Sequence, residues 1–444
     1  MADTLAAALP APSAARQILG LAAPTALSAV LQVAAQIAET WLAARQGTAA
    51  LAGWSVVLPF SLLMQQMSAG AMGGGVSSAT ARALGAGRRE EASALVLHAV
   101  LIAVAAGGAF AVLLAVFPRA VLGAIGGATA AEAAAPYAMW LFGLGAVPVW
   151  LANTLASVLR GGGQHALAAR VLLVTWAAYP PLAWALAEPL GMGLPGIGAA
   201  MGASFLACTL VMGVAVLRGR AGFRPTLRVR PSAAMFWRIL SVGLVASALA
   251  GVANLTTILV TARLASHGAA AVAAYGISAR LEFLMIPIAF GVGSALTALV
   301  GRAVGAGRWD MALRLAWTGG AMALAVTGAI GLLVAAAPGA FAGFFSADPA
   351  VIAVAKRALS YTGLAFGGFG LGMALYFASQ GAGRMGWPMA AGVSRIAVAV
   401  GGGWLLGDVL GMGLDGQFLA VALGITAYGL VTAMGVRRAV WAPR

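Results

Sequence analysis

Long apolar runs, each of about 20 residues or more, alternate with short polar breaks along the whole chain. A helix needs about 20 apolar residues to cross the hydrocarbon core of a bilayer, so each run predicts a membrane-spanning helix. Strands of a membrane barrel are the weaker interpretation, because they are shorter and alternate polar with apolar residues. The pattern predicts twelve spans, at about 18–44, 50–79, 93–117, 135–159, 166–187, 194–217, 237–264, 270–300, 311–336, 351–379, 386–407 and 414–436.

The second half of the chain repeats short motifs of the first half, 220 positions later. The run Ala83–Arg88 returns as Ala303–Arg308, and Gly191–Gly196 returns as Gly411–Gly416. Each half holds six predicted spans, an even number, so both halves enter the membrane from the same side and form a parallel repeat. Two such bundles side by side leave a central cleft that can open alternately to each side of the membrane.

Five segments follow from this organisation. Their bounds are an N-terminal tail at 1–15, a first lobe of six spans at 16–217, a basic linker at 218–236, a second lobe of six spans at 237–436, and a C-terminal tail at 437–444.

The composition indicates that lipid is the solvent. Hydrophobic residues make up 62% of the chain and charged residues only 8%, against about 25% charged residues in a soluble domain. The net charge of +15 could indicate binding to nucleic acid. Most of the basic residues, however, fall between spans on one predicted side of the membrane, which is the positive-inside pattern. We therefore expect a multi-pass protein of the plasma (inner) membrane with both termini cytoplasmic, and no nucleic-acid partner.

The residues that could hold a metal or a nucleotide are sparse. Cys208 stands alone and the three histidines are scattered, so neither a disulfide nor a metal pattern appears. The glycine-rich stretch at 70–75 lacks the lysine of a phosphate-binding loop. We expect no cofactor and no resident metal.

Five polar residues share one face of the first predicted span, at spacings of three and four. They are Thr25, Ser28, Gln32, Gln36 and Glu39. Polar groups in hydrocarbon are costly and usually face a cavity. The stripe predicts that this helix lines the cleft; hydrogen bonding between helices is the alternative.

Glu39 ends the stripe, and no basic residue lies within a turn on the same face. Burial disfavours the charged form of a carboxylate, so such a group can exchange a proton, or bind Na⁺ with help from neighbouring amides. We expect Glu39 and Gln36 to couple transport to H⁺ or Na⁺. The alternative is a glutamate that reaches the water at the membrane interface.

Glu282 is the other acid within a span, and it shares a face with Tyr275 and Ser278. Arg280 is two positions away, so the two charged side chains do not face each other along the helix. We expect Glu282 to belong to the coupling residues; a structural ion pair across helices is the alternative. Arg280 is the basic residue that we place deep within a span.

The remaining candidates are polar or aromatic residues inside spans. Asn153 joins the predicted cation site, and the others are expected to line the substrate cavity, with packing as the alternative for the aromatic ones. These cavity residues are Gln65, Trp150, Asn254, Tyr361 and Tyr376, in addition to Thr25, Ser28, Gln32, Tyr275 and Arg280.

The order of the motifs resembles the MATE family, the multidrug and toxic compound extrusion transporters, over nearly the whole chain. The resemblance is carried by Pro24 in the first span, Gly47–Ala52 after an acid, Ala83–Gly87 after the glycine-rich second span, Leu159–Gly163 after the fourth span, and their counterparts in the second half.

This resemblance implies two six-helix lobes with a V-shaped central cleft and export of organic, often cationic compounds in exchange for H⁺ or Na⁺. Glu39 stands where the family usually has Asp, and Asn153 is similar to a fourth-span Asn that helps to bind the cation in some members. The chain departs from the family at Ala178–Leu182, where the fifth span lacks an acid. The seventh and tenth spans carry no acid either.

We therefore predict a monomeric secondary antiporter for multidrug efflux and not an enzyme. A flippase for lipid-linked saccharides is the nearest alternative, although it would need a strongly cationic cavity. An intramembrane enzyme would need clustered catalytic groups, and two separate acids do not provide them. A purely structural subunit would leave the polar stripe of the first span without a role.

Overall fold

The computed structural model describes residues 13–226 and 228–441, which form helices and turns with no strand among them. Twelve helical stretches in this part of the chain are long and apolar enough to cross a membrane, which confirms the predicted all-α fold. They are Ala14–Arg45, Thr48–Gly85, Arg89–Val116, Gly127–Gly161, His165–Ala187, Leu194–Leu217, Ala233–Ala265, Ala269–Gly305, Trp309–Ala336, Pro349–Ala382, Gly386–Val409 and Gly413–Gly435.

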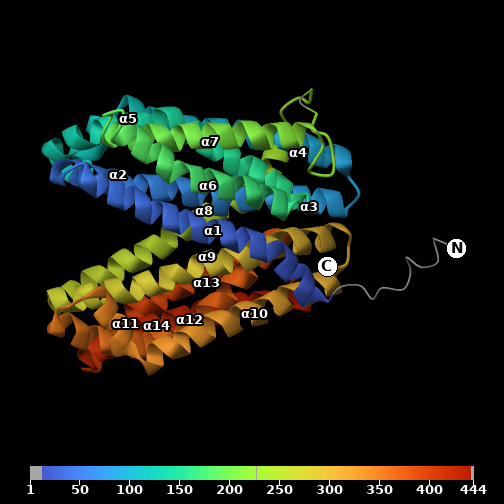
Figure 1. Cartoon of the computed structure of the whole chain (residues 1–444). Coiled ribbons are helices and arrows are strands. Elements are labelled where there is room, and N and C mark those ends of the chain that lie inside the picture. Colours follow the sequence, from blue (N-terminus) through green and yellow to red (C-terminus); the bar gives the residue numbers. More distant parts are fainter. Residues whose placement is uncertain (1–12, 227, 442–444) are drawn as a thin grey trace.

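The two halves form two groups of helices, the first in the upper and the second in the lower part of Figure 1. The first consists of α1 (Ala14–Arg45), α2 (Thr48–Gln65), the π-helical segment η1 (Gln66–Met72), α3 (Gly73–Gly85), α4 (Arg89–Ala111), η2 (Val112–Val116), α5 (Pro118–Gly161), α6 (His165–Ala187) and α7 (Leu194–Leu217). The second consists of α8 (Ala233–Ala265), α9 (Ala269–Gly305), α10 (Trp309–Ala336), α11 (Pro338–Phe345), α12 (Pro349–Ala382), α13 (Gly386–Ile396), η3 (Ala397–Gly401), η4 (Trp404–Val409), α14 (Gly413–Gly435) and α15 (Arg438–Trp441).

The helix ends reproduce the sequence repeat. Helix α3 ends at Gly85 and α9 ends at Gly305, 220 positions later. The turn after each helix contains a glycine with φ near +74°, at Gly87 and at Gly307. Glycine adopts this left-handed conformation at little steric cost, so the repeated motif encodes the same tight turn in both halves.

The halves meet at the end of the molecule that carries these two turns, which we call the junction end. There α3 packs against α8, α9 and α12 of the other half. A side chain at Gly85 would collide with the backbone carbonyl of Arg302, and one at Gly305 with that of Arg82. Glycine at both positions therefore lets the two backbones touch, and the ribbons diverge from here toward the opposite end (Figure 1).

The first helix of each half is also anchored in the core of the other half. Ile18 and Ala22 of α1 belong to a buried cluster that includes Leu296 and Leu315 of the second half. In the same way, Ile239 of α8 is buried in the core of the first half. This exchange holds α1 and α8 between the two bundles.

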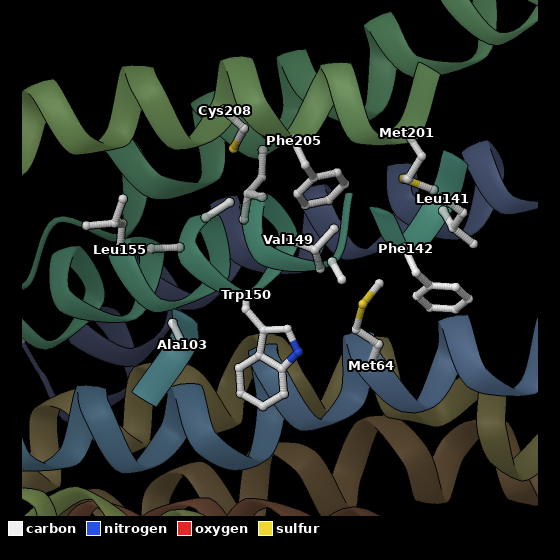
Figure 2. Close-up of a cluster of buried hydrophobic side chains, with 14 of the residues drawn as sticks. Met64, Ala103, Leu141, Phe142, Val149, Trp150, Leu155, Met201, Phe205 and Cys208 are labelled. Carbon is white, nitrogen blue, oxygen red and sulfur yellow. The ribbon is translucent and has the colours of Figure 1, made fainter. Parts of the chain in front are cut away.

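The main hydrophobic core lies within the first half, where α5 is central. Figure 2 shows Trp150 of α5 among apolar side chains that include Met64, Val149 and Phe142. Trp150 is 1% exposed, and its ring packs against Phe110, with the two centroids 6.4 Å apart. Cys208 is buried in the same region with a free thiol.

The segment between the halves is held against α4. Residues 218–226 and 228–232 form no helix, and α8 begins at Ala233, inside the predicted linker range. Ser93 accepts a hydrogen bond from the backbone N–H of Thr226 at 2.6 Å, and His98 Nε2 accepts one from that of Ser232 at 2.9 Å. Of the predicted tails, residues 1–12 and 442–444 lie outside the described residues.

Candidate functional site

The buried acid of the first half is Glu39, in the last two turns of α1, and it is 5% exposed. Its Oε1 accepts a hydrogen bond from Trp54 Nε1 of α2 at 3.0 Å and another from the Tyr137 hydroxyl of α5 at 2.7 Å. A carboxylate accepts hydrogen bonds and donates none when it is ionised, so two donors aimed at one oxygen suit its charged form. Glu39 thereby links three helices of the first half.

A second tyrosine lies near Glu39, and no arginine pairs with it among the described residues. The Tyr179 hydroxyl of α6 is also buried, close enough to Glu39 to interact with it electrostatically. Arg45, six positions after Glu39, instead forms an ion pair with Glu188, with Nε and Oε1 2.6 Å apart. Among the described residues, Glu39 therefore has only uncharged donors.

The Arg45–Glu188 pair lies at the end of α1 that is away from the junction end. Glu188 follows the last residue of α6 and lies outside the membrane-spanning helices. The hydrogen bond from Arg45 holds the pKa of the Glu188 carboxyl below its usual value.

The rest of the polar stripe on α1 divides between two environments. Thr25 and Ser28 are buried and donate to backbone carbonyls of α1 itself. Gln32 donates through Nε2 to Oε1 of Gln65 at 2.8 Å, which is the interhelical bonding that the sequence left open as the alternative. The Gln36 side chain is partly buried and makes no hydrogen bond within the described part of the chain.

Asn153 is buried in α5, but it is not bonded to Glu39. Its Nδ2 donates to Ser68 Oγ of η1 at 2.9 Å, and its backbone carbonyl accepts a hydrogen bond from the Ser157 hydroxyl. The structure therefore places Glu39 and Asn153, which the sequence assigned to one cation site, in separate hydrogen-bonded groups.

The buried acid of the second half forms an ion pair. Glu282 Oε1 lies 2.6 Å from an Nη of Arg395 on α13, and the two side chains are 10% and 13% exposed. The Arg395 guanidinium also lies over the Phe369 ring, 5.8 Å from its centroid. Tyr275 and Tyr428 interact electrostatically with both charged groups. Glu282 therefore forms the ion pair across helices that the sequence left open as the alternative, and its role in coupling stays a prediction.

The basic residue deep within a span is Arg395, and not Arg280 as the sequence predicts. Arg395 lies ten residues into α13, and Arg160 is a second buried arginine, at the end of α5. Arg280 itself is exposed on α9. The sequence does contain an indication of this role, because Arg395 is the single basic residue in the apolar run 386–407.

The other expected cavity residues are dispersed. Asn254 is exposed on α8, with its Nδ2 bonded to a carbonyl of its own helix. Tyr361 is partly buried. Tyr376 is buried, and its hydroxyl accepts a hydrogen bond from Gln380. Trp150, expected as a cavity wall, lies inside the core of the first half, because a fully surrounded indole packs better there than on an open face.

Sequence reasoning found Glu39 and missed its three neighbours. Trp54, Tyr137 and Tyr179 come from α2, α5 and α6, and no local spacing relates them to Glu39. Among the described residues, no three His, Cys, Asp or Glu side chains cluster to hold a metal ion. The first half thus offers one buried carboxylate that connects three helices.

Comparison with known proteins identifies the same architecture. The MatE family model matches residues 24–185 and 235–405, more than half of the chain. No curated protein matches the chain at the level of sequence.

Several solved structures share the fold. A multidrug resistance MATE family transporter of the MOP superfamily in an outward-facing conformation has a TM-score of 0.87 and 21% identity, covering 97% of this chain and 96% of that chain. A MOP superfamily transporter from Pyrococcus furiosus, described by the reverse polarity of its binding pocket, has a TM-score of 0.88, 20% identity, and coverages of 97% and 96%. A mutant of the Vibrio cholerae MATE transporter VcmN has a TM-score of 0.88, 19% identity, and coverages of 97% and 98%.

Proposed function

The chain belongs to the MatE family, whose members are membrane transporters and not enzymes, and we propose that it is a secondary antiporter that exports organic compounds in exchange for protons. The observation that carries this proposal is the buried carboxylate of Glu39, held by Trp54 and Tyr137 without any arginine. Of the two buried acids within spans, Glu39 is the one whose charge no cation neutralises.

The donors around Glu39 favour a proton over Na⁺ as the coupling ion. An indole N–H can only donate, so Trp54 directs a hydrogen atom at the oxygen that a sodium ion would need. Oxygen ligands suit hard cations such as Na⁺, and Tyr137 is the one oxygen donor bonded to Glu39. A proton needs a single carboxylate oxygen and leaves both donors in place.

Protonation would then change how the first half is held together. Hydrogen bonds to an ionised carboxylate are roughly twice as strong as neutral ones. Neutral Glu39 holds Trp54 and Tyr137 less tightly, so α1 is freer to move against α2 and α5. We propose that this weaker contact favours the conformation that releases substrate, and that loss of the proton restores the one that accepts it.

The substrate class follows by analogy. One similar structure is named as a multidrug resistance transporter, and others are MATE proteins in complex with the compounds MaL6 and MaD3S. We propose organic, often cationic substrates, with Gln32 and Gln65 among the polar groups that meet them. We also propose a monomer in the plasma (inner) membrane with both termini cytoplasmic.

The test is transport by the purified full chain in sealed proteoliposomes, with proton and sodium gradients imposed separately. Glu39→Gln keeps the size of the side chain and removes its titration, so proton-driven export should fall to the level without a gradient. Glu132→Gln is the control, because Glu132 forms an exposed ion pair with Arg119, and it should transport normally. Full proton-driven export by a well-folded Glu39→Gln protein would disprove the coupling role, and export driven by sodium alone would disprove the choice of ion.

A further inference from the structure

A small cavity lies at the junction end, and both halves contribute to its wall. The space between its lining residues, about 240 Å³, includes open solvent, and only about 10 Å³ of it can hold the centre of a water molecule. Its polar lining consists of Ser77, Ser157 and Arg160 from the first half and Ser294, Thr297 and Gln380 from the second. No acidic residue lines it, and it is separate from the surroundings of Glu39.

The lining follows the internal repeat. Ser77 and Thr297 are 220 positions apart, and so are Arg160 and Gln380. The cavity is therefore built from equivalent positions of the two halves and lies where the repeat brings them face to face. Equivalent positions do not all carry the same residue, and at one pair a cation of the first half, Arg160, corresponds to an amide of the second, Gln380.

Arg160 is a buried cation without an anion. It is 4% exposed, and its guanidinium makes no hydrogen bond or ion pair with any described residue. The Phe290 ring, 5.5 Å away from Cζ, gives partial compensation. The charged or titratable groups that act on this region are His165 and Arg302, which carry no negative charge. A buried charge is normally paired, because its removal from water is otherwise uncompensated.

Ser77 supplies a second unused donor to the same cavity. Its Oγ is buried and has no hydrogen-bond partner among the described residues. The hydroxyls of Ser157, Ser294 and Thr297 already donate to backbone carbonyls. The polar groups of the cavity without a hydrogen-bond partner are thus the Arg160 guanidinium and the Ser77 hydroxyl. Together they can donate hydrogen bonds to a small anion that carries one negative charge.

We propose that this junction cavity binds a small monovalent inorganic anion, for which chloride is the probe. Arg160 and Ser77 would be its ligands, and Gln380 would face them from the other half. Since both halves form the wall, the site is complete only while the halves meet at the junction end. A bound anion therefore stabilises this conformation relative to one in which the junction end opens.

The test uses the purified full-length protein in detergent, with chloride titrated against gluconate at constant ionic strength. The wild type should show a melting temperature that rises with chloride and saturates. Arg160→Gln, which copies the equivalent residue Gln380, should abolish this rise. Arg170→Gln is the matched control, because Arg170 is exposed on α6, and it should respond like the wild type.

Two further measurements keep the proposal testable where Arg160→Gln does not fold. Ser77→Ala removes a hydroxyl that bonds to nothing else, so folding should be intact and the chloride affinity should fall by about tenfold, as for the loss of one hydrogen bond to a charged group. Line broadening of the ³⁵Cl resonance reports binding directly and should weaken in the same variant.

Three outcomes would overturn the assignment. A wild type without any saturable chloride response would mean that water alone fills the cavity. An unchanged response in Ser77→Ala and Arg160→Gln would place the anion elsewhere. A response to phosphate but not to chloride would show that the site takes a different anion. None of these outcomes depends on whether Glu39 couples transport to protons.

Discussion

The Glu282–Arg395 ion pair permits a quantitative prediction about the second half. Both side chains are almost fully buried, at 10% and 13% exposure, and 2.6 Å separates their charged atoms. Removal of one partner leaves the other charge buried and uncompensated, which typically costs about 3–5 kcal/mol. Glu282→Gln and Arg395→Gln should each lower the ratio of folded to unfolded protein by roughly a hundredfold or more, because 1.4 kcal/mol is a factor of ten.

The double variant separates a charge effect from a loss of packing. With glutamine at both positions no charge remains unpaired, so most of the lost stability should return. Thermal melts of the four proteins in one detergent give the interaction free energy of the pair as a double-mutant cycle. Single variants as stable as the wild type, or a double variant no better than the weaker single one, would refute this reasoning.

The same four proteins also decide what Glu282 does in transport. If the pair is structural, the double variant should retain proton-driven export in proteoliposomes once its expression is matched to the wild type. Loss of the proton dependence in a stable double variant would return Glu282 to the coupling residues that the sequence suggested. Glu39→Gln provides the comparison, because it should lose coupling at a smaller cost in stability.

Three further predictions concern other parts of the molecule. Trp54→Phe removes one charge-assisted donor from Glu39, so stability should fall by about 1.5–3 kcal/mol in thermal melts; a variant as stable as the wild type would contradict the strength assigned to this contact. Gly305→Val should obstruct the backbone contact of the junction end and abolish transport, whereas Gly108→Ala, a helical position with free space around it, should transport normally in the same assay. The pKa of Glu188 is lowered by its partner Arg45, so the ion pair stabilises the folded protein at pH values above the usual glutamate pKa. This stabilisation is lost as the pH falls through the lowered pKa. Thermal melts at decreasing pH should show the loss in the wild type and not in Glu188→Gln.

Hydropathy predicted the fold because lipid imposes one simple rule on every span. Each crossing needs about 20 apolar residues, so the twelve helices could be read from the sequence without knowledge of their contacts. The 220-residue repeat also predicted two similar halves, and the equivalent turns at Gly87 and Gly307 agree with it. The way in which Ile18 of α1 enters the core of the other half could not be predicted, because it depends on how the bundles cross.

The candidate site was predictable only in part, for a related reason. Glu39 was visible as an acid at the end of a polar stripe, but its donors Trp54 and Tyr137 lie 15 and 98 positions away in the sequence. An aromatic residue in a span has the same hydropathy whether it packs in a core, as Trp150 does, or bonds to a carboxylate. Tertiary contact decides between these roles, and periodicity carries no information about it.

The near-equivalence of the two halves has an electrostatic consequence at their meeting point. Several residues at which the halves meet are 220 positions apart, so each half presents equivalent positions to the other, as two identical subunits do about a twofold axis. Strict identity would place two guanidinium groups in one narrow space, where like charges close together in a medium of low polarity repel strongly. Glutamine at position 380 avoids that repulsion. The two halves can therefore close on each other here because only one of the two equivalent positions carries a positive charge.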